Sequence, residues 1–203
     1  MVITMPNDTK DRILEAALEI FSRDGYAGAN LKDIAGAVGV VKSGFYRHYA
    51  SKEELWDAVL DEMERYYAER FGSSENPPAV PQSTDELKTL TLRMLDFTMH
   101  DEKIIMTRKI LLTEQFRDAR VRALATKHFG AGLEALFTKL FAGMMESGSM
   151  KHDDPAMLAF AYTAPISTLV QLSDREPERF EEVTGKIEAF VEHFVCIYGM
   201  QGE

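Results

Sequence analysis

The chain has 203 residues, with 33 acidic against 23 basic side chains and a formal net charge of −10. Its composition is that of a globular protein of one or two domains. No run approaches the roughly 18 apolar residues that a membrane span needs, and the N-terminus lacks the basic and then apolar pattern of a secretory signal. The single cysteine, Cys196, cannot form an intrachain disulfide. We expect a cytoplasmic protein with no membrane partner.

The charge is unevenly distributed. Residues 1–56 carry seven basic and eight acidic side chains, so most of the negative charge lies in the rest of the chain. Within residues 30–52 the balance reverses, with one acidic residue against four basic ones: Lys32, Lys42, Arg47 and Lys52. A small basic region on an acidic body is compatible with DNA binding. Charge alone does not establish DNA binding, because four basic residues in 23 are also ordinary for a protein surface.

The first predicted helix begins near residue 9 and ends at Gly25. Thr9 or Asp8 can cap its N-terminus, and glycine adopts the left-handed conformation that ends helices at little cost. The apolar residues between these points recur at helical spacing: Ile13, Ala16, Ala17, Ile20 and Phe21.

Two short helices and a longer one are predicted next, over residues 31–38, 42–49 and 52–71. Asn30 caps the first, Gly39 permits the tight turn between the short helices, and Ser51 caps the long one. The apolar side chains that would fill the space between the short helices are Ile34, Ala35, Val38, Val40 and Phe45. Two short helices joined by a glycine turn, with a preceding helix to pack on, make a helix-turn-helix.

The rest of the chain is predicted to be helical after a linker at residues 72–84 that contains three prolines. Helices are expected at about 85–100, 103–116, 119–147, 154–173 and 177–199. The third should break near Gly130 and Gly132, and Pro165 should kink the fourth. No alternating strand pattern is present, so the fold class is all-α.

This pattern predicts four parts of the chain. They are a helix-turn-helix domain (1–50), a connecting helix (51–71), the linker (72–84) and a C-terminal helical domain (85–203).

The segment 13–55 contains five linked sequence blocks at fixed spacing. They are Ile-Leu-Glu-Ala-Ala-Leu-Glu-Ile-Phe-Ser-Arg-Asp-Gly-Tyr (13–26), Asp-Ile-Ala (33–35), Val-Gly-Val (38–40), Phe-Tyr-Arg-His-Tyr (45–49) and Ser-Lys-Glu-Glu-Leu (51–55). In order and spacing they resemble the signature of the TetR (tetracycline repressor) family of transcriptional regulators. The resemblance covers roughly a quarter of the chain, and the remainder is similar only in length and helical pattern. It implies a dimeric repressor that binds a palindromic operator in double-stranded DNA.

The resemblance also implies which residues contact DNA. Tyr46, His48 and Lys52 match positions that contact phosphates. Lys42, Ser43, Gly44 and Arg47 match positions near base edges, and Asn30 completes the predicted set. The chemistry agrees, because Lys and Arg neutralise phosphates and Arg also reads guanine in the major groove. We expect Phe45 and Tyr49 to lie in the core instead.

Two residues depart from the family pattern. Many members carry Ser or Thr immediately before the lysine, as a cap of the recognition helix, whereas Val41 cannot cap by its side chain. Gly44 stands where many members carry Thr and therefore offers no side chain to a base. Val41 could still touch a thymine methyl group, so we expect an altered sequence preference and not a loss of binding.

For the C-terminal part, the family implies a ligand cavity among the middle helices and a dimer interface on the last two. The predicted ligand residues, for a small apolar or aromatic effector, are Phe97, His100, Met106, Ile110, His128, Phe129, Phe137 and Tyr162. The predicted interface residues are Leu158, Tyr162, Ile166, Leu169, Ile187, Phe190, Val191, Phe194 and Ile197. The alternative for both sets is that they form the chain's own core.

Other functions stay open to different degrees. A DNA-binding architectural or cell-division factor without an effector is the main alternative, and promoter geometry could make the protein an activator. An enzyme is disfavoured, because no H-x-x-x-H or C-x-x-C pair, G-x-S-x-G elbow or glycine-rich phosphate loop is present. We expect no cofactor and no metal. Cys196 is expected to be a buried structural thiol, with a redox role as the alternative.

Overall fold

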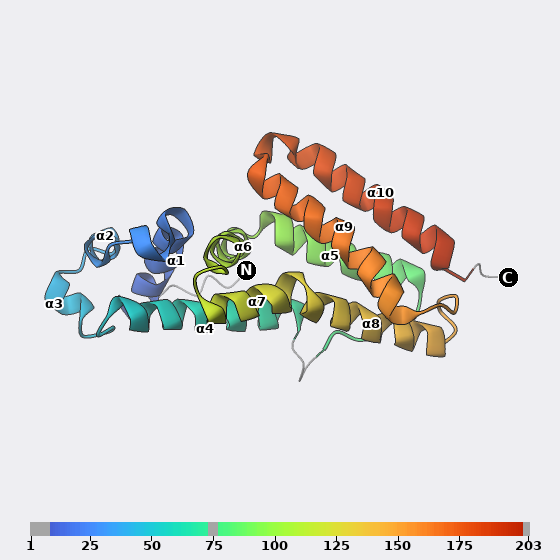
Figure 1. Ribbon diagram of the computed structural model, residues 1–203, viewed down its shortest axis with the longest axis horizontal. Coiled ribbons are helices and arrows are strands. Elements are labelled where there is room, and N and C mark those ends of the chain that lie inside the picture. The colour runs from blue at the N-terminus through green and yellow to red at the C-terminus, as the bar shows by residue number, and fades with distance from the viewer. Residues whose placement is uncertain (1–8, 73–76, 201–203) are drawn as a thin grey trace. The chain divides into compact units, whose positions relative to one another are not determined.

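The structure is a computed structural model that describes residues 9–72 and 77–200, and its regular elements are helices (Figure 1). They are α1 (Thr9–Gly28), α2 (Leu31–Ala37), α3 (Lys42–Phe45), α4 (Lys52–Phe71), α5 (Thr84–His100), α6 (Glu102–Glu114), α7 (Ala119–Phe129), α8 (Ala131–Glu146), α9 (Pro155–Arg175), a 3-10 turn (Pro177–Arg179) and α10 (Phe180–Tyr198). The predicted all-α class is confirmed.

The helices form two compact units. Among the described residues, unit 1 contains those up to Ala68 together with Met106–Arg122, and unit 2 contains those from Glu69 to Ile105 and from Ala123 onward. Residues 106–122, which the sequence placed with the C-terminal domain, therefore pack with the N-terminal helices. The functional boundaries at residues 50, 71 and 84 stay predictions.

Local capping fixes the helices of unit 1. The Asn30 side-chain oxygen accepts from the Lys32 N–H at 2.9 Å, as predicted for the cap of α2. Ser51 Oγ accepts from the Glu54 N–H at 3.0 Å, while Glu54 Oε2 accepts from the Ala50 N–H at 2.6 Å. This pair is similar to a capping box, except that Glu54 accepts from the residue before the cap, and it satisfies two backbone donors at the start of α4. Asp8, the other predicted cap of α1, lies outside the described residues.

Two predicted helix ends differ from the structure. Gly25 breaks α1 with φ 69°, but one more turn carries the helix to Gly28. Helix α3 ends at Phe45 and not at residue 49, because beyond Phe45 the regular four-residue spacing of the backbone hydrogen bonds is interrupted by three-residue bonds, as from the His48 N–H to the Phe45 oxygen at 2.9 Å. A tight turn of this kind ends an α-helix.

Residues 114–118, between α6 and α7, are held against α1 and α4 inside unit 1. Glu114 is 4% exposed, and its Oε1 accepts from the Tyr26 N–H at 3.1 Å. A β-carbon at Gly25 would lie 2.6 Å from this oxygen, so a larger residue would displace the Glu114 carboxylate, and the positive φ of 69° favours glycine independently. Asp118 Oδ2 accepts from the Trp56 indole N–H at 2.9 Å, while its Oδ1 caps α7.

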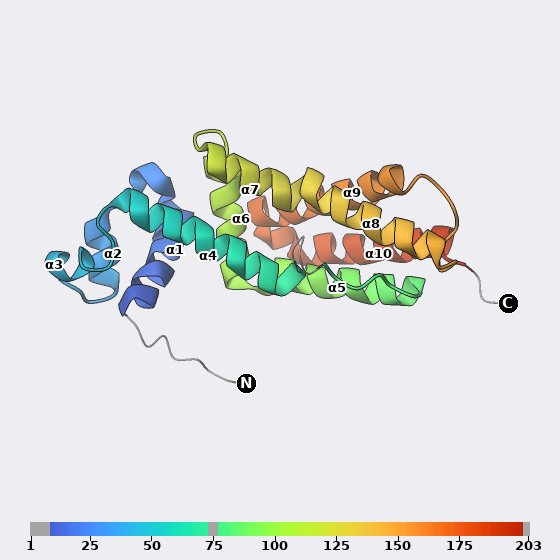
Figure 2. The same ribbon diagram turned by 90° about the horizontal axis from the view of Figure 1, so that it is seen from below.

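Unit 2 is built on contacts of α9 with α8 and α10, and of α10 with α5 (Figures 1 and 2). Aromatic rings form the centre of its core, with Tyr162 within 5.5 Å of Phe141 and 4.5 Å of Phe194 between ring centroids. The Tyr162 hydroxyl shares a 2.7 Å hydrogen bond with Thr91, which satisfies a polar group in an apolar surrounding. The predicted break at Gly130 separates α7 from α8, and Pro165 lies inside α9 as predicted.

Helix α9 is long and apolar enough, by length and composition, to cross a membrane, and 33% of its apolar 18-residue stretch is buried. A core helix passes the same test, and α9 packs against α8 and α10, so this is weak evidence for a membrane span. Cys196 on α10 is exposed, so the expectation of a buried thiol was wrong. The helix turns its larger side chains Phe194 and Val191 inward instead.

Asp118 gives a test of the contact between residues 114–118 and α4. Burial alone would raise the pKa of this carboxyl, but hydrogen bonds from Trp56 and from the backbone of Val121 and Arg120 outweigh it, so the pKa is lowered. A lowered pKa contributes stability above the ordinary value of 3.8, and this contribution is lost as the pH falls below that value. We expect Asp118→Asn to lower the free energy of unfolding by about 1–3 kcal/mol at pH 7.

The measurement is urea unfolding of the full chain between pH 7 and pH 3. The difference between the wild type and Asp118→Asn should shrink below pH 4, and a constant difference would contradict the assignment. Asp61→Asn is the matched control. Its exposed carboxylate also faces α7 through an ion pair with Arg120, and exposed pairs contribute little.

Candidate nucleic-acid interface

Helix α3 and the turn after it present a cluster of exposed polar side chains. Lys42, Ser43, Tyr46 and Arg47 are exposed, whereas Gly44 and His48 are half-buried. The same segment is anchored by Phe45 and Tyr49, which are 1% and 2% exposed, so the prediction that these two lie in the core is confirmed. Alternation of buried and exposed residues thus aims the predicted DNA-contacting side chains outward from a fixed base.

Ring contacts restrict Tyr46. Its ring meets that of Phe45 edge-to-face, with centroids 5.6 Å apart and planes at 87°. The ammonium group of Lys42 lies 5.9 Å from the Tyr46 ring centroid, within the range of a cation–π contact. Both contacts hold the exposed phenol in place beside the lysine, which lowers the entropy that a DNA contact would cost.

Lys52 is a predicted DNA contact, but its ammonium group already interacts with other residues of unit 1. Its Nζ donates to the Ala29 carbonyl oxygen at 2.6 Å and lies 4.7 Å from the Tyr26 ring centroid. The side chain is half-buried and joins the end of α1 to the start of α4. Burial, together with Glu53, Asp57 and Asp118, raises the pKa of Tyr26, so this phenol is neutral and suits a cation over its face.

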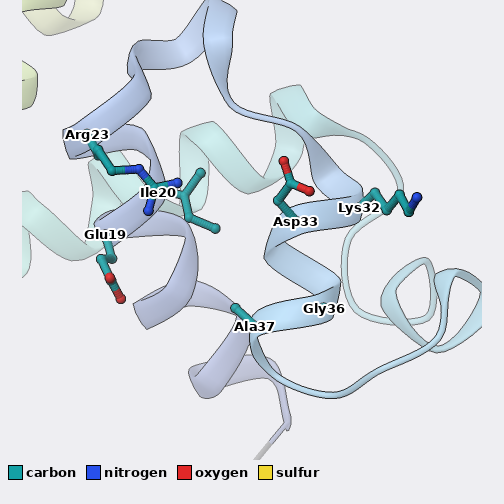
Figure 3. A pocket seen from close by; sticks show the side chains of 7 residues that line it. All are labelled: Glu19, Ile20, Arg23, Lys32, Asp33, Gly36 and Ala37. Atoms are coloured by element: carbon teal, nitrogen blue, oxygen red, sulfur yellow. The ribbon is translucent and has the colours of Figure 1, made fainter.

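Asn30 and Lys32 lie at the start of α2. Asn30 is exposed, and its side-chain oxygen is used in the cap, which leaves its amide N–H groups as donors. Lys32 helps to line a groove of about 550 Å³ between α1 and α2, with Glu19, Ile20, Arg23, Asp33, Gly36 and Ala37 (Figure 3). None of the predicted effector residues lies there, and two acidic and two basic side chains give it a mixed charge.

Sequence reasoning missed two basic residues of α1. Lys10 has its ammonium 5.6 Å from the Tyr49 ring centroid, which places a further cation next to the turn after α3. Arg12 Nη2 donates to the Val38 carbonyl oxygen at 2.8 Å and so caps the end of α2 just before the turn. Both residues are far from α3 in the sequence, and only the packing of α1 against the short helices reveals their roles.

The predicted effector residues are divided between the two units. Met106 and Ile110 belong to unit 1 and the others to unit 2. Ile110, Phe137 and Tyr162 are buried, whereas Phe97 and His100 are exposed and Met106, His128 and Phe129 are half-buried. Phe137 and Tyr162 pack with ring centroids 5.2 Å apart. The effector site stays a prediction.

The predicted dimer residues differ in how far their own chain buries them. Five are buried in the core of unit 2: Leu158, Tyr162, Ile187, Val191 and Phe194. Side chains that their own chain already covers offer little surface to a partner, and the dimer interface stays a prediction. Ile166, Leu169 and Phe190 are half-buried, and Ile197 is exposed.

Together with Ile197, three apolar side chains that were not predicted are exposed on α9 and just beyond the end of α10. Met157 and Phe160 are 61% and 54% exposed, and Ile197 and Met200 are 42% and 56% exposed. The Lys151 N–H donates to the Tyr198 carbonyl oxygen at 2.9 Å, which joins the segment before α9 to the end of α10. The four side chains therefore lie toward one end of the helix pair. The spacing of Met157 and Phe160, three residues apart on a helix, was the available signal.

Metal binding finds no support in the described ranges. Within residues 9–72 and 77–200, no group of three or more His, Cys, Asp or Glu side chains is arranged to hold a metal ion.

Comparison with known proteins agrees with the N-terminal motif. Residues 13–59 match the family model described as bacterial regulatory proteins, tetR family. The biofilm operon negative transcriptional regulator IcaR of Staphylococcus epidermidis is 36% identical over 58 residues. That match covers 29% of this chain and 31% of IcaR, so it spans about a third of that relative. The regulator TtgR of Pseudomonas putida is 28% identical over 169 residues, 76% of each chain.

Solved structures show the same fold over nearly the whole chain. SmeT, the repressor of the Stenotrophomonas maltophilia multidrug efflux pump SmeDEF, superposes with a TM-score of 0.68 at 16% identity and covers 97% of this chain and 93% of its own. Its complex with triclosan gives a TM-score of 0.72 at 17% identity, over 96% and 93%. The motif, the helix-turn-helix geometry and these similarities agree: residues 13–59 carry the N-terminal domain of the tetR family of bacterial regulatory proteins, and the chain shares its fold with the repressor SmeT.

Proposed function

We propose that this protein is a cytoplasmic transcriptional repressor that binds a palindromic operator as a homodimer. The observation that carries the proposal is the exposed cluster Lys42, Ser43, Tyr46 and Arg47 on a helix anchored by Phe45 and Tyr49. Support for repression comes from the relatives, since IcaR is a negative regulator and SmeT a repressor.

In this proposal the recognition helix α3 enters the major groove. Lys42 and Arg47 supply positive charge there, and Arg47 reads base edges. Tyr46 and His48 donate to phosphates on either side, while the Asn30 amide donates from the start of α2. Lys52 has a different part, because its ammonium is already bonded to Ala29 and lies over Tyr26. It positions α4 against α1 and does not neutralise phosphate.

The proposed dimer forms through α9 and α10. Four exposed apolar side chains at one end of this pair, Met157, Phe160, Ile197 and Met200, are supplemented by the half-buried Ile166, Leu169 and Phe190. A second copy packed on the pair would complete a four-helix bundle with a twofold axis. Two symmetric recognition helices then require half-sites about one helical turn apart.

An effector completes the proposal. SmeT has been solved with triclosan, a small aromatic compound, and this similarity supports a small aromatic ligand for the present chain. Such a ligand must bind the DNA-incompetent state more tightly, because equal affinity for both states shifts nothing. Tilting of α4 would couple it to the recognition helices. Titration of operator-bound protein with triclosan and related compounds tests this, and binding without release would favour a factor that lacks an effector.

Lys42 and Lys52 should respond differently to substitution. Lys42→Met removes an exposed cation. A plot of the logarithm of operator affinity against the logarithm of salt concentration should therefore become less steep by roughly 0.9 for each phosphate that is no longer neutralised. Lys52→Met removes the bond to Ala29 and the contact with Tyr26, so it should cost about 1–2 kcal/mol of stability and leave the slope unchanged. Fluorescence anisotropy across a salt series measures the slopes. A lower slope for Lys52→Met would assign that residue to phosphate, and no measurable DNA affinity in the wild type would overturn the function.

Phe160→Glu tests the proposed dimer surface. Its side chain is 54% exposed, so the change should leave the protomer folded while placing two carboxylates at the interface. Sedimentation velocity should show a monomer, and operator affinity should fall. The matched control is Phe116→Glu, which changes an even more exposed phenylalanine in unit 1 and should leave a dimer. A Phe160→Glu variant that remains dimeric would place the interface elsewhere.

A further inference from the structure

Val41, at the start of the recognition helix, has a side chain that neither caps the helix nor is buried. It occupies the N-cap of α3 with φ −75° and ψ 157°, and its side chain makes no cap bond. Valine is among the poorest N-cap residues, whereas Ser or Thr at this position would satisfy a backbone N–H and stabilise the helix. The Val41 side chain is also 72% exposed, so its methyl groups gain nothing from burial in the protein.

The surroundings of Val41 are open and apolar. Gly44 follows one turn later, and a β-carbon there would lie 3.9 Å from Val41 Cγ2 and 3.9 Å from Val40 Cβ. The missing side chain therefore leaves the Val41 methyl groups and the Gly44 backbone as one small apolar surface. Lys42 and Ser43 are exposed beside it, so the apolar surface lies within the cluster that is proposed to enter the major groove.

A surface of this kind suits one base. Thymine alone carries a methyl group at C5 in the major groove, and it is recognised by apolar side chains. A side chain that sacrifices a cap bond and remains exposed is expected where function requires it. We propose that Val41, with the open backbone at Gly44, contacts the C5-methyl group of one thymine in each half-site. This inference rests on the proposed DNA binding and adds a specificity-determining residue to it.

Uracil substitution tests the contact directly, because deoxyuridine differs from thymidine only by that methyl group. The duplex of highest affinity is selected from random DNA, and each thymine is replaced in turn by deoxyuridine. For the wild type we expect one symmetric pair of thymines at which each replacement lowers affinity about fourfold, the effect of one buried methyl group. The other thymines of the duplex serve as internal controls.

Two variants assign that loss to Val41. Val41→Ala removes the methyl groups with no change in capping ability, and Val41→Ser removes them while adding a cap hydroxyl, so at least one should remain as stable as the wild type. In both variants the uracil penalty should be clearly smaller than in the wild type, because the Cβ that remains reaches less far than the two γ-methyl groups of valine. A uracil penalty that persists undiminished in both variants, or no penalty in the wild type, would overturn the inference while DNA binding stands. Failure to recover any preferred duplex would overturn the proposed function itself.

Discussion

The proposed function depends on the anchoring of a helix that is too short to be stable alone. Helix α3 has four residues, far fewer than an isolated helix needs in water. Its orientation is therefore set by the burial of Phe45 and Tyr49 and by the fixed turn at Gly39. Every exposed side chain that we assign to DNA, from Lys42 to Arg47, takes its direction from those two buried rings.

The anchor itself is tied to more distant parts of unit 1. Arg12 caps the helix before the turn, and Lys52 joins the end of α1 to the start of α4. Residues 114–118 add a second connection, since Glu114 accepts from the backbone at the Gly25 kink and Asp118 from Trp56 on α4. A movement of α6 would therefore change contacts at both helices that support α3.

Much of the fold and part of the site could be predicted from the sequence because the signals were local. Asn30 and Ser51 cap the helices where expected, and Phe45 and Tyr49 are buried where the motif placed them. Interactions between distant segments could not be predicted in the same way. Nothing near Lys52 indicates that its ammonium bonds to Ala29, and nothing near Glu114 indicates its contact with Tyr26. The dimer interface stays a prediction, because an apolar stripe shows that a face is covered but not by which chain.

Selection from random duplex DNA, followed by footprinting of the recovered site, tests the central claim most directly. The account predicts a palindrome whose half-sites are separated by about 10–10.5 base pairs or a multiple, since two recognition helices related by a twofold axis must meet successive turns of the major groove. An asymmetric site, or no enriched sequence at all, would contradict the account of a dimer that reads DNA through α3.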